Sequence, residues 1–200
     1  MAAGLAERLD DRLDSMMMVH PPREVPESWE SRFEKLYLEH YGRVVGVLFR
    51  LTSSRSEAEE LSNEVFWKLY RQRLLPNPDG NVGGWLYRTA TNLGIDALRK
   101  SARRREHESE AARIAFQSRG SSGPLDEVLR DENRQRVRQV LARLKPVQAK
   151  ALVLCASGFS YHEVAETLGV KRVSVGTLIL RAEQAFRKHF RAVAGEKEEI

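Results

Sequence analysis

Two basic stretches are the parts of this 200-residue sequence whose residue types most directly indicate a chemistry. Residues 81–105 carry six basic side chains against one aspartate, and residues 171–191 carry six against one glutamate, so each stretch has a net charge of +5. Clustered guanidinium and ammonium groups bind phosphates. The two stretches therefore predict two contacts with one polyanion, most simply a nucleic acid, with two solvated helix faces as the alternative.

A second pattern indicates how the later stretch could meet DNA. Gly169 lies four positions after Ala165, and Val175 lies six positions after Gly169, which is the spacing of a helix-turn-helix. The small residue lets two helices cross closely, the glycine turns the chain, and the branched residue packs the second helix on the first. Ser160 and Glu163 have the spacing of a capping box ahead of the first helix. The pattern predicts a DNA-binding helix pair, with an ordinary helical hairpin as the alternative.

Side chains for catalysis or metal binding are not grouped along the sequence. Asp96 is the only acid in its basic stretch, and no Ser/His/Asp set or pair of carboxylates has a catalytic spacing. Cys155 is the only cysteine, and neither it nor the five histidines have metal-ligand spacing. We therefore expect no catalytic residue, metal, cofactor or small-molecule substrate, and a protein that is not an enzyme.

Composition limits the setting in which these elements fold. Hydrophobic residues make up 42% of the chain and charged residues 30%, which is a globular composition. The longest apolar run, Ala151 to Ala156, is far shorter than the roughly 20 residues of a membrane-spanning helix. Residues 1–30 hold seven acids and three arginines and lack the basic start and apolar centre of a secretory signal. We expect a cytoplasmic protein without membrane insertion.

Apolar residues recur at three- and four-residue steps through most of the chain, and no segment alternates as a strand would. The spacing predicts helices from Trp29 to about Thr52, from Ser56, capped with Glu59, to about Arg73, and from Trp85 to about Arg105. In the second half, Val137, Val140, Leu141 and Leu144 mark one helix, Val147 to Ala156 a short apolar one, Val164, Ala165 and Leu168 the first of the helix pair, and Val175 and Leu178 the second. The fold class is therefore all-α.

Breaks in this pattern predict the domain organisation. Residues 106–124 turn polar and end in Ser118-Arg-Gly-Ser-Ser-Gly-Pro124, a composition typical of a flexible linker. We expect two small helical domains, residues 29–105 and 125–193, with the helix-turn-helix in the second. Residues 1–28 are expected to be a mobile N-terminal extension and residues 194–200 an acidic tail.

Together, the two halves resemble the extracytoplasmic-function (ECF) sigma factors, the smallest members of the sigma-70 family of bacterial transcription initiation factors. The first half has the pattern of the family's helical region 2 in Ala58-Glu-Glu-Leu-Ser-Asn-Glu-Val-Phe66 and in Trp85-Leu-Tyr-Arg-Thr-Ala-Thr-Asn-Leu-Gly-Ile-Asp-Ala-Leu-Arg99. The second half resembles region 4 through Leu144-Lys-Pro, Gly158-Phe-Ser-Tyr-His-Glu-Val-Ala165 and Val175-Gly-Thr177. The resemblance covers roughly residues 30–190. It implies a sigma factor that binds core RNA polymerase and directs promoter recognition and opening.

The resemblance implies a polymerase-binding face in the first half. In the family, the second helix of region 2 docks on an arginine-rich coiled coil of the polymerase β′ subunit. The matching face here carries carboxylates and an amide, which suit such a partner, at Glu59, Glu60, Asn63 and Glu64. The family usually has an aspartate at the position of Glu60 and a glutamine at that of Asn63, and this chain keeps the charge and the amide.

Residues 74–84 and the helix after them resemble the reader of the minus-ten promoter element, where a base of the opened strand is flipped into a pocket. The resemblance places Asn92 at a base edge and implies phosphate contacts from Arg88, Arg99, Lys100 and Arg103. Trp85 and Tyr87 could stack on bases, and core packing is the favoured reading of both. The family opens DNA without a catalytic group, because captured bases offset the cost of unpairing.

The implied recognition helix departs from the family pattern, because Leu178, Ile179 and Leu180 stand where basic or small polar residues are typical. For the minus-thirty-five element we expect phosphate contacts from Lys171, Arg172, Thr177 and Arg181, thymine-methyl contacts from Ile179 and Leu180, and adenine pairing by Gln184. A protein interface at the apolar start of this helix is the alternative.

The implied partners are core RNA polymerase and promoter DNA. An anti-sigma factor is a further candidate partner, because many family members are held inactive by one. The main alternative is a helix-turn-helix transcription regulator that is not a polymerase subunit, but the strandless first half disfavours the receiver or ligand-binding domain of such a regulator. A helical adaptor that binds only protein would leave both basic stretches unexplained.

Overall fold

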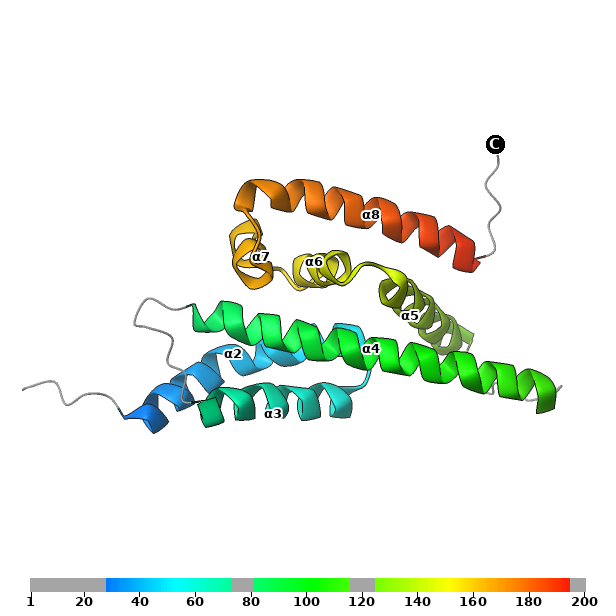
Figure 1. The fold of residues 1–200 in the computed structure, drawn as a ribbon. Helices are drawn as coiled ribbons and strands as arrows, with labels where there is room; N and C mark the ends of the chain where they lie inside the picture. Colours follow the sequence, from blue (N-terminus) through cyan, green and yellow to red (C-terminus); the bar gives the residue numbers. More distant parts are fainter. Residues whose placement is uncertain (1–27, 73–80, 116–124, 195–200) are drawn as a thin grey trace, which may run out of the picture. The chain divides into compact units, whose positions relative to one another are not determined.

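The computed structural model describes residues 28–72, 81–115 and 125–194, with side chains at residues 28–72, 81–107 and 132–193. Figure 1 shows the helices α2 (Trp29–Thr52), α3 (Arg55–Gln72), α4 (Val82–Ala115), α5 (Leu125–Arg143), α6 (Pro146–Ala156), α7 (Tyr161–Leu168) and α8 (Arg172–Ala194). No strand occurs in these described ranges. The predicted all-α fold is confirmed.

The chain divides into two compact units, residues 1–35 and residues 36–200. The described part of the first unit is mainly the start of α2, where the rings of Trp29 and Phe33 lie 6.1 Å apart. The second unit contains the rest of α2 and every helix from α3 to α8. The expected domain division at residues 106–124 remains a prediction, and the helices on both sides of it lie in this one unit.

The core of the first half follows from the helical spacing of its apolar residues. One face each of α2, α3 and α4 is buried, through Val44, Val47, Leu48 and Leu51 on α2, Val65, Phe66 and Leu69 on α3, and Leu86, Tyr87, Ala90, Ile95 and Leu98 on α4. Gly94 lets α4 approach α2 closely, because a Cβ at this position would lie 2.5 Å from Cδ1 of Leu51. The hydrophobic core thus fixes which face of α4 remains outside.

The helix-turn-helix has the local structure that its sequence predicts. Ser160 caps α7, its hydroxyl accepting the amide N–H of Glu163, whose carboxylate in turn accepts the backbone N–H of Ser160. Gly169 ends the helix in the left-handed conformation, with φ at 67°, which glycine adopts without steric cost. Ala165 and Val175 are buried between the two helices. The predicted capping box and turn are confirmed.

Two helix starts differ from the sequence prediction. The N-terminal cap of α3 is Ser54, whose hydroxyl accepts the N–H of Glu57 at 3.3 Å, whereas the predicted cap Ser56 lies inside the helix and donates to Glu60. Helix α4 begins at Val82, earlier than predicted, because the side chain of Asn81 accepts the N–H of Gly84 at 2.6 Å and caps it.

Helix α4 also ends later than predicted. It continues to Ala115 through residues 106–115, which were expected to be linker. This segment is rich in Glu and Ala and has no glycine or proline, so its intrinsic helix propensity is high. The expectations for residues 1–27, 73–80, 116–124 and 195–200 lie outside the described residues.

Candidate nucleic-acid interface

The predicted polymerase-binding residues form one outer face of α3. Glu60, Asn63 and Glu64 are exposed, and Glu59 is half-buried. Glu59 pairs with Arg55 at 2.5 Å and Glu64 with Lys68 at 2.7 Å, both one turn apart on the same helix. Exposed pairs of this kind contribute only about 0.3–0.5 kcal/mol each, so they hold these carboxylates only weakly.

Two exposed aromatic residues extend this face, and sequence reasoning missed them. Trp67 has 57% of its surface exposed, and its ring stacks with that of Tyr70 at 6.1 Å between centroids. The signal for them was available, because Trp67 follows Asn63 by one helical turn. The outer face of α3 is therefore acidic in its first half and aromatic in its second.

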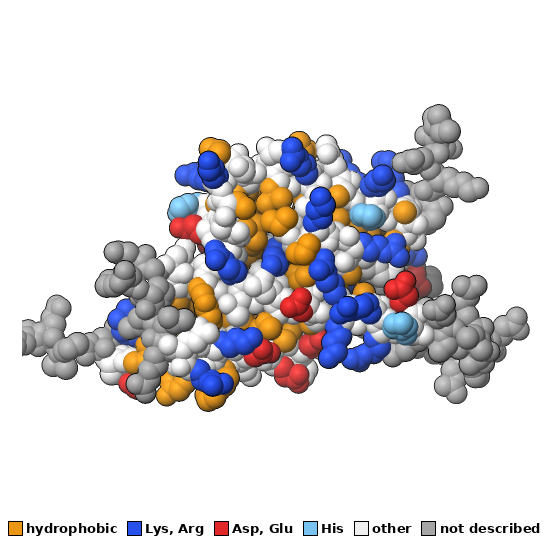
Figure 2. All heavy atoms as spheres, in the orientation of Figure 1, with side chains coloured by type: hydrophobic (Ala, Val, Ile, Leu, Met, Phe, Trp, Pro, Cys, Tyr) orange, Lys and Arg blue, Asp and Glu red, His pale blue; other side chains and the backbone are white. Residues whose placement is uncertain are grey.

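The predicted minus-ten residues follow one another along α4. Arg88, Asn92, Lys100 and Arg103 are exposed, and Arg99 is half-buried. Figure 2 shows Lys and Arg side chains gathered over the later part of α4 and over α8. Tyr87 is only 3% exposed, which supports core packing over base stacking for this ring, and Trp85 is half-buried.

Three of these five residues contact the second half of the chain. Arg88 donates to the backbone carbonyls of Thr167 at 2.8 Å and Glu166 at 2.9 Å, at the C-terminal end of α7. These interactions, which we call the α4 contacts, also include a hydrogen bond from Lys150 Nζ to Asn92 Oδ1 and one from Arg99 Nη2 to the Leu144 carbonyl at 3.1 Å. The sequence does not indicate these contacts, because Arg88 and Arg99 bind backbone carbonyls, which have no residue signature, and Lys150 lies far from Asn92 along the chain.

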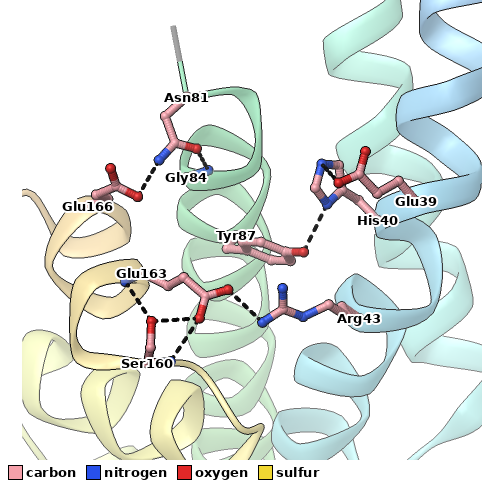
Figure 3. A network of polar contacts seen from close by, with 9 residues as sticks. All are labelled: Glu39, His40, Arg43, Asn81, Gly84, Tyr87, Ser160, Glu163 and Glu166. Carbon is pink, nitrogen blue, oxygen red and sulfur yellow. Dashed lines mark hydrogen bonds and ion pairs between the residues drawn. The ribbon is translucent and has the colours of Figure 1, made fainter.

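A polar network lies beside the α4 contacts (Figure 3). Arg43 of α2 forms an ion pair of 2.8 Å with Glu163, the residue that completes the α7 capping box. Asn81, the cap of α4, donates its amide to the Glu166 carboxylate at 2.5 Å. The Tyr87 hydroxyl lies 3.0 Å from Nδ1 of His40. The N-terminus of α4 and the middle of α2 are thus both joined to α7.

Electrostatics in this network follow from burial and hydrogen bonding. The pKa of Glu163 is lowered, first by the backbone N–H of Ser160 and then by Arg43, so its carboxylate is stabilised in the charged form. Burial lowers the pKa of His40, which favours the neutral imidazole beside Tyr87. Burial likewise lowers the pKa of Lys150, an effect that nearby Asp96 opposes.

Helix α8 presents most of its predicted minus-thirty-five residues on one exposed face. The exposed members of the predicted set are Lys171, Arg172, Thr177, Leu180, Arg181 and Gln184. Ile179 is only 9% exposed, because it belongs to the buried stripe that also contains Val175 and Ala182. The structure therefore directs Ile179 toward the protein core, whereas the expectation was a contact with a thymine methyl.

Comparison with known proteins identifies both halves. A family model of sigma-70 region 2 matches residues 36–104, and a model of sigma-70 region 4 matches residues 134–186, which together are more than half of the chain. The chain belongs to the sigma-70 family of sigma factors. In the described part of this sigma factor, no helix is long and apolar enough to cross a membrane.

Relatives of this sigma factor agree with the predicted ECF group. It is 32% identical over 160 residues to the ECF RNA polymerase sigma factor SigE of Mycolicibacterium smegmatis, covering 78% of this chain and 61% of SigE. It is 30% identical over 171 residues to the RNA polymerase sigma factor CarQ of Myxococcus xanthus, covering 84% of this chain and 92% of CarQ. The chain therefore spans less than two thirds of SigE but nearly all of CarQ. The predicted family is confirmed.

A solved structure is also similar to this sigma factor. It is the sigma factor RpoE of Bartonella quintana in complex with the anti-sigma factor NepR, with 21% identity and a TM-score of 0.47. The match covers 84% of this chain and 99% of that chain.

Proposed function

We propose that this sigma factor binds core RNA polymerase through α3, captures the opened minus-ten strand on α4 and reads the minus-thirty-five element with α8. The observation that carries the proposal is the presence of both sigma-70 regions in one chain, each with most of its expected binding residues exposed. A transcription regulator that is not a polymerase subunit is not favoured, because both sigma-70 regions are matched in one chain. The proposed work takes place in the cytoplasm, where polymerase and promoter DNA meet.

The α3 face supplies the chemistry for the polymerase contact. Exposed carboxylates of Glu60 and Glu64, with the amide of Asn63 between them, can accept charge-assisted hydrogen bonds from arginines of the partner. The exposed ring of Trp67 can stack on a guanidinium at the edge of the same contact. Acidic and aromatic groups on one helix face thus favour an arginine-rich partner.

On α4, strand capture is binding and not catalysis. The Asn92 amide can donate to and accept from a base edge, while Lys100 and Arg103 are exposed cations for phosphates. Unstacking and unpairing a base costs a few kcal/mol, which such contacts can offset. Arg88 and Arg99 would join the site when their present hydrogen bonds are released.

For the minus-thirty-five element, the exposed face of α8 offers Leu180 for a thymine methyl and Gln184 for an adenine edge. Lys171 and Arg172 lie at the N-terminal end of this helix, where free backbone N–H groups also favour phosphate. Ile179 leaves the proposed set because of its burial.

A reconstituted transcription assay tests this proposal. Purified protein and bacterial core polymerase are incubated with a genomic DNA library, and start sites are read by sequencing. We expect discrete new starts that share an upstream sequence pattern. If core polymerase neither binds the protein nor gains starts, the proposed function is wrong.

Charge reversal on α3 separates the polymerase contact from general charge effects. The double change Glu60→Lys and Glu64→Lys should weaken core binding by at least about tenfold, because it places cations against arginines. Glu132→Lys is the matched control, since Glu132 is exposed and pairs with Arg136 one turn away, as Glu64 pairs with Lys68. Equal losses in both proteins would refute the assignment of the α3 face.

A further inference from the structure

We propose that a cavity lined by α2, α5, α6 and α8 binds a long-chain aliphatic carboxylate, a free fatty acid. The cavity has a volume of about 940 Å³, within the roughly 300–1,000 Å³ of small-molecule sites. Every residue that lines it belongs to the compact unit 36–200, and the lining includes none of the residues proposed above for polymerase or DNA. The proposal therefore goes beyond the function proposed above.

The most buried residues that line the cavity are aliphatic. Leu141 of α5, Val153 of α6 and Ile179 of α8 are each at most 9% exposed. Ile179 is the residue whose burial removed it from the proposed DNA-reading set. The Ser157 hydroxyl also lines the cavity, and it donates to the Val153 carbonyl at 2.8 Å, within the last turn of α6. These walls therefore suit a hydrocarbon chain better than a polar ring.

Helix α2 borders the cavity with one long face. The residues of this face recur at three- and four-residue steps: Gly42, Gly46, Phe49 and Ser53. A Cβ added at either glycine would meet no atom within 4 Å, so the backbone of α2 is open to a ligand there. From residue 42 to residue 53 the face is about 16 Å long. This length favours an extended chain over a compact molecule.

Positive charge predominates among the charged residues that line the cavity. They are four arginines and one acid: Arg43, Arg50, Arg134, Arg187 and Glu183. Arg43 is paired with Glu163 (Figure 3), whereas no ion pair joins Arg50 or Arg187 to another residue of the described ranges. A carboxylate beside either of these two guanidinium groups would form a charge-assisted hydrogen bond, which is about twice as strong as a neutral one. The ligand should therefore be anionic at one end and hydrocarbon along the rest.

An acidic amphipathic helix of a partner protein has the same combination of properties, but the cavity is too small for it. A helix about 16 Å long and 10 Å wide fills at least about 1,300 Å³, which exceeds the volume of the cavity. A single hydrocarbon chain is much thinner and brings no backbone groups that need hydrogen-bond partners. The dimensions therefore favour the small molecule.

The single cysteine of the chain provides a reporter, because Cys155 lines the cavity and is half-buried. Its reaction with a chromogenic disulfide reagent is followed in the wild-type protein at fixed pH, with and without monomeric oleate. We expect oleate to slow the reaction about tenfold at a concentration about ten times its Kd. Oleyl alcohol has the same chain without the carboxylate, and butyrate has the carboxylate without the chain. Both should protect the thiol far less.

Variants test which groups form the site, with the fluorescent fatty acid cis-parinarate as the probe. The double change Arg50→Gln and Arg187→Gln removes two cations of the cavity, and Gly46→Leu fills the space beside α2. Each of these two variants should bind the probe about tenfold more weakly than the wild type does. The double change Arg71→Gln and Arg191→Gln is the matched control, because it removes the same charge from exposed positions that do not line the cavity. Circular dichroism confirms that each variant is folded.

Each outcome decides the proposal. Protection of Cys155 by oleate, with weaker probe binding in the two cavity variants alone, supports it. Equal protection by oleyl alcohol overturns it, because the arginines then contribute nothing, and an equal loss in the matched control overturns it, because binding then depends only on total charge. If oleate gives no protection, the proposal is overturned and a partner protein becomes the better occupant. If Gly46→Leu does not fold, the wild-type protection and the arginine variants decide.

The transcription assay distinguishes this proposal from the proposed function, because the substitutions alter none of the residues proposed for polymerase or DNA. A protein that initiates transcription but binds no oleate keeps the proposed function and loses the ligand site. A protein that binds oleate but neither binds core polymerase nor gains starts keeps the ligand site and loses the proposed function.

Discussion

Replacing Gly94 by alanine should destabilise the protein, although alanine is the better helix former. A Cβ at this position would lie 2.5 Å from Cδ1 of Leu51, 3.2 Å from Cδ2 of Leu48 and 3.3 Å from Cβ of Leu51. Carbon atoms prefer separations of about 3.5–4.0 Å, and both leucines are completely buried, so neither has free space to move into. Overpacking of this kind costs about 3 kcal/mol at the upper end of its usual range.

The higher helix propensity of alanine offsets about 1 kcal/mol of this destabilisation. The net loss in the free energy of unfolding should therefore be about 2 kcal/mol, which lowers Tm by roughly 4–8 °C for a chain of this size. Gly46 provides the matched control, because it also lies inside a helix and a Cβ there would meet no atom within 4 Å. Gly46→Ala should stabilise the protein by about 1 kcal/mol.

Urea unfolding followed by circular dichroism measures both variants against the wild type. The two substitutions should shift the urea midpoint in opposite directions. If Gly94→Ala is as stable as Gly46→Ala, α4 and α2 do not approach as closely as described, and the placement of Asn92 and Arg88 on the outer face of α4 loses its structural basis.

Three further predictions concern α7 and α8. Ser160→Ala should lower the free energy of unfolding by about 1 kcal/mol, whereas Ser160→Thr, which keeps the hydroxyl, should lose much less in the same urea experiment. Because the folded pKa of Glu163 lies below its ordinary value of 4.5, its charged form stabilises the fold above that pH, and the benefit is lost as the pH falls through the folded pKa. The difference in the free energy of unfolding between wild type and Glu163→Gln should thus be largest at neutral pH and vanish in acid. A difference that does not change with pH would show that the charge of Glu163 is not its cause. Gln184→Ala should relax sequence preference at one position of the minus-thirty-five element, by about 1–3 kcal/mol in binding competition, and unchanged preference would remove Gln184 from the reading face.

Local signals explain what could be predicted from the sequence. The capping box at Ser160, the left-handed Gly169 and the buried Val175 each depend on residues within a few positions, so the helix-turn-helix was predicted correctly. The start of α3 was not, because Ser54 and Ser56 are each followed by a glutamate three residues later and the local pattern cannot choose between them. Packing of Ala58, which is completely buried, fixes the register.

The candidate site was predictable in part. The exposed positions on α3 and α8 follow from helical periodicity, and the same periodicity counted from Val175 would have indicated the burial of Ile179. The α4 contacts could not be predicted. Their acceptors include the carbonyls of Leu144, Glu166 and Thr167, which every residue type possesses, and residues far apart in sequence form them.

The length of α7 has a consequence for how much change this protein tolerates. The helix has eight residues, so its ends are separated by about 12 Å, and both ends hold the first half: Glu163 near its start binds Arg43, and the carbonyl of Thr167 near its end binds Arg88. Each residue of an α-helix turns the chain by about 100°. An insertion or deletion of one residue between Glu163 and Thr167 would rotate one binding group away from its partner while the other stayed in place. Substitutions on the outer side of α7 should therefore be tolerated far better than any change in its length.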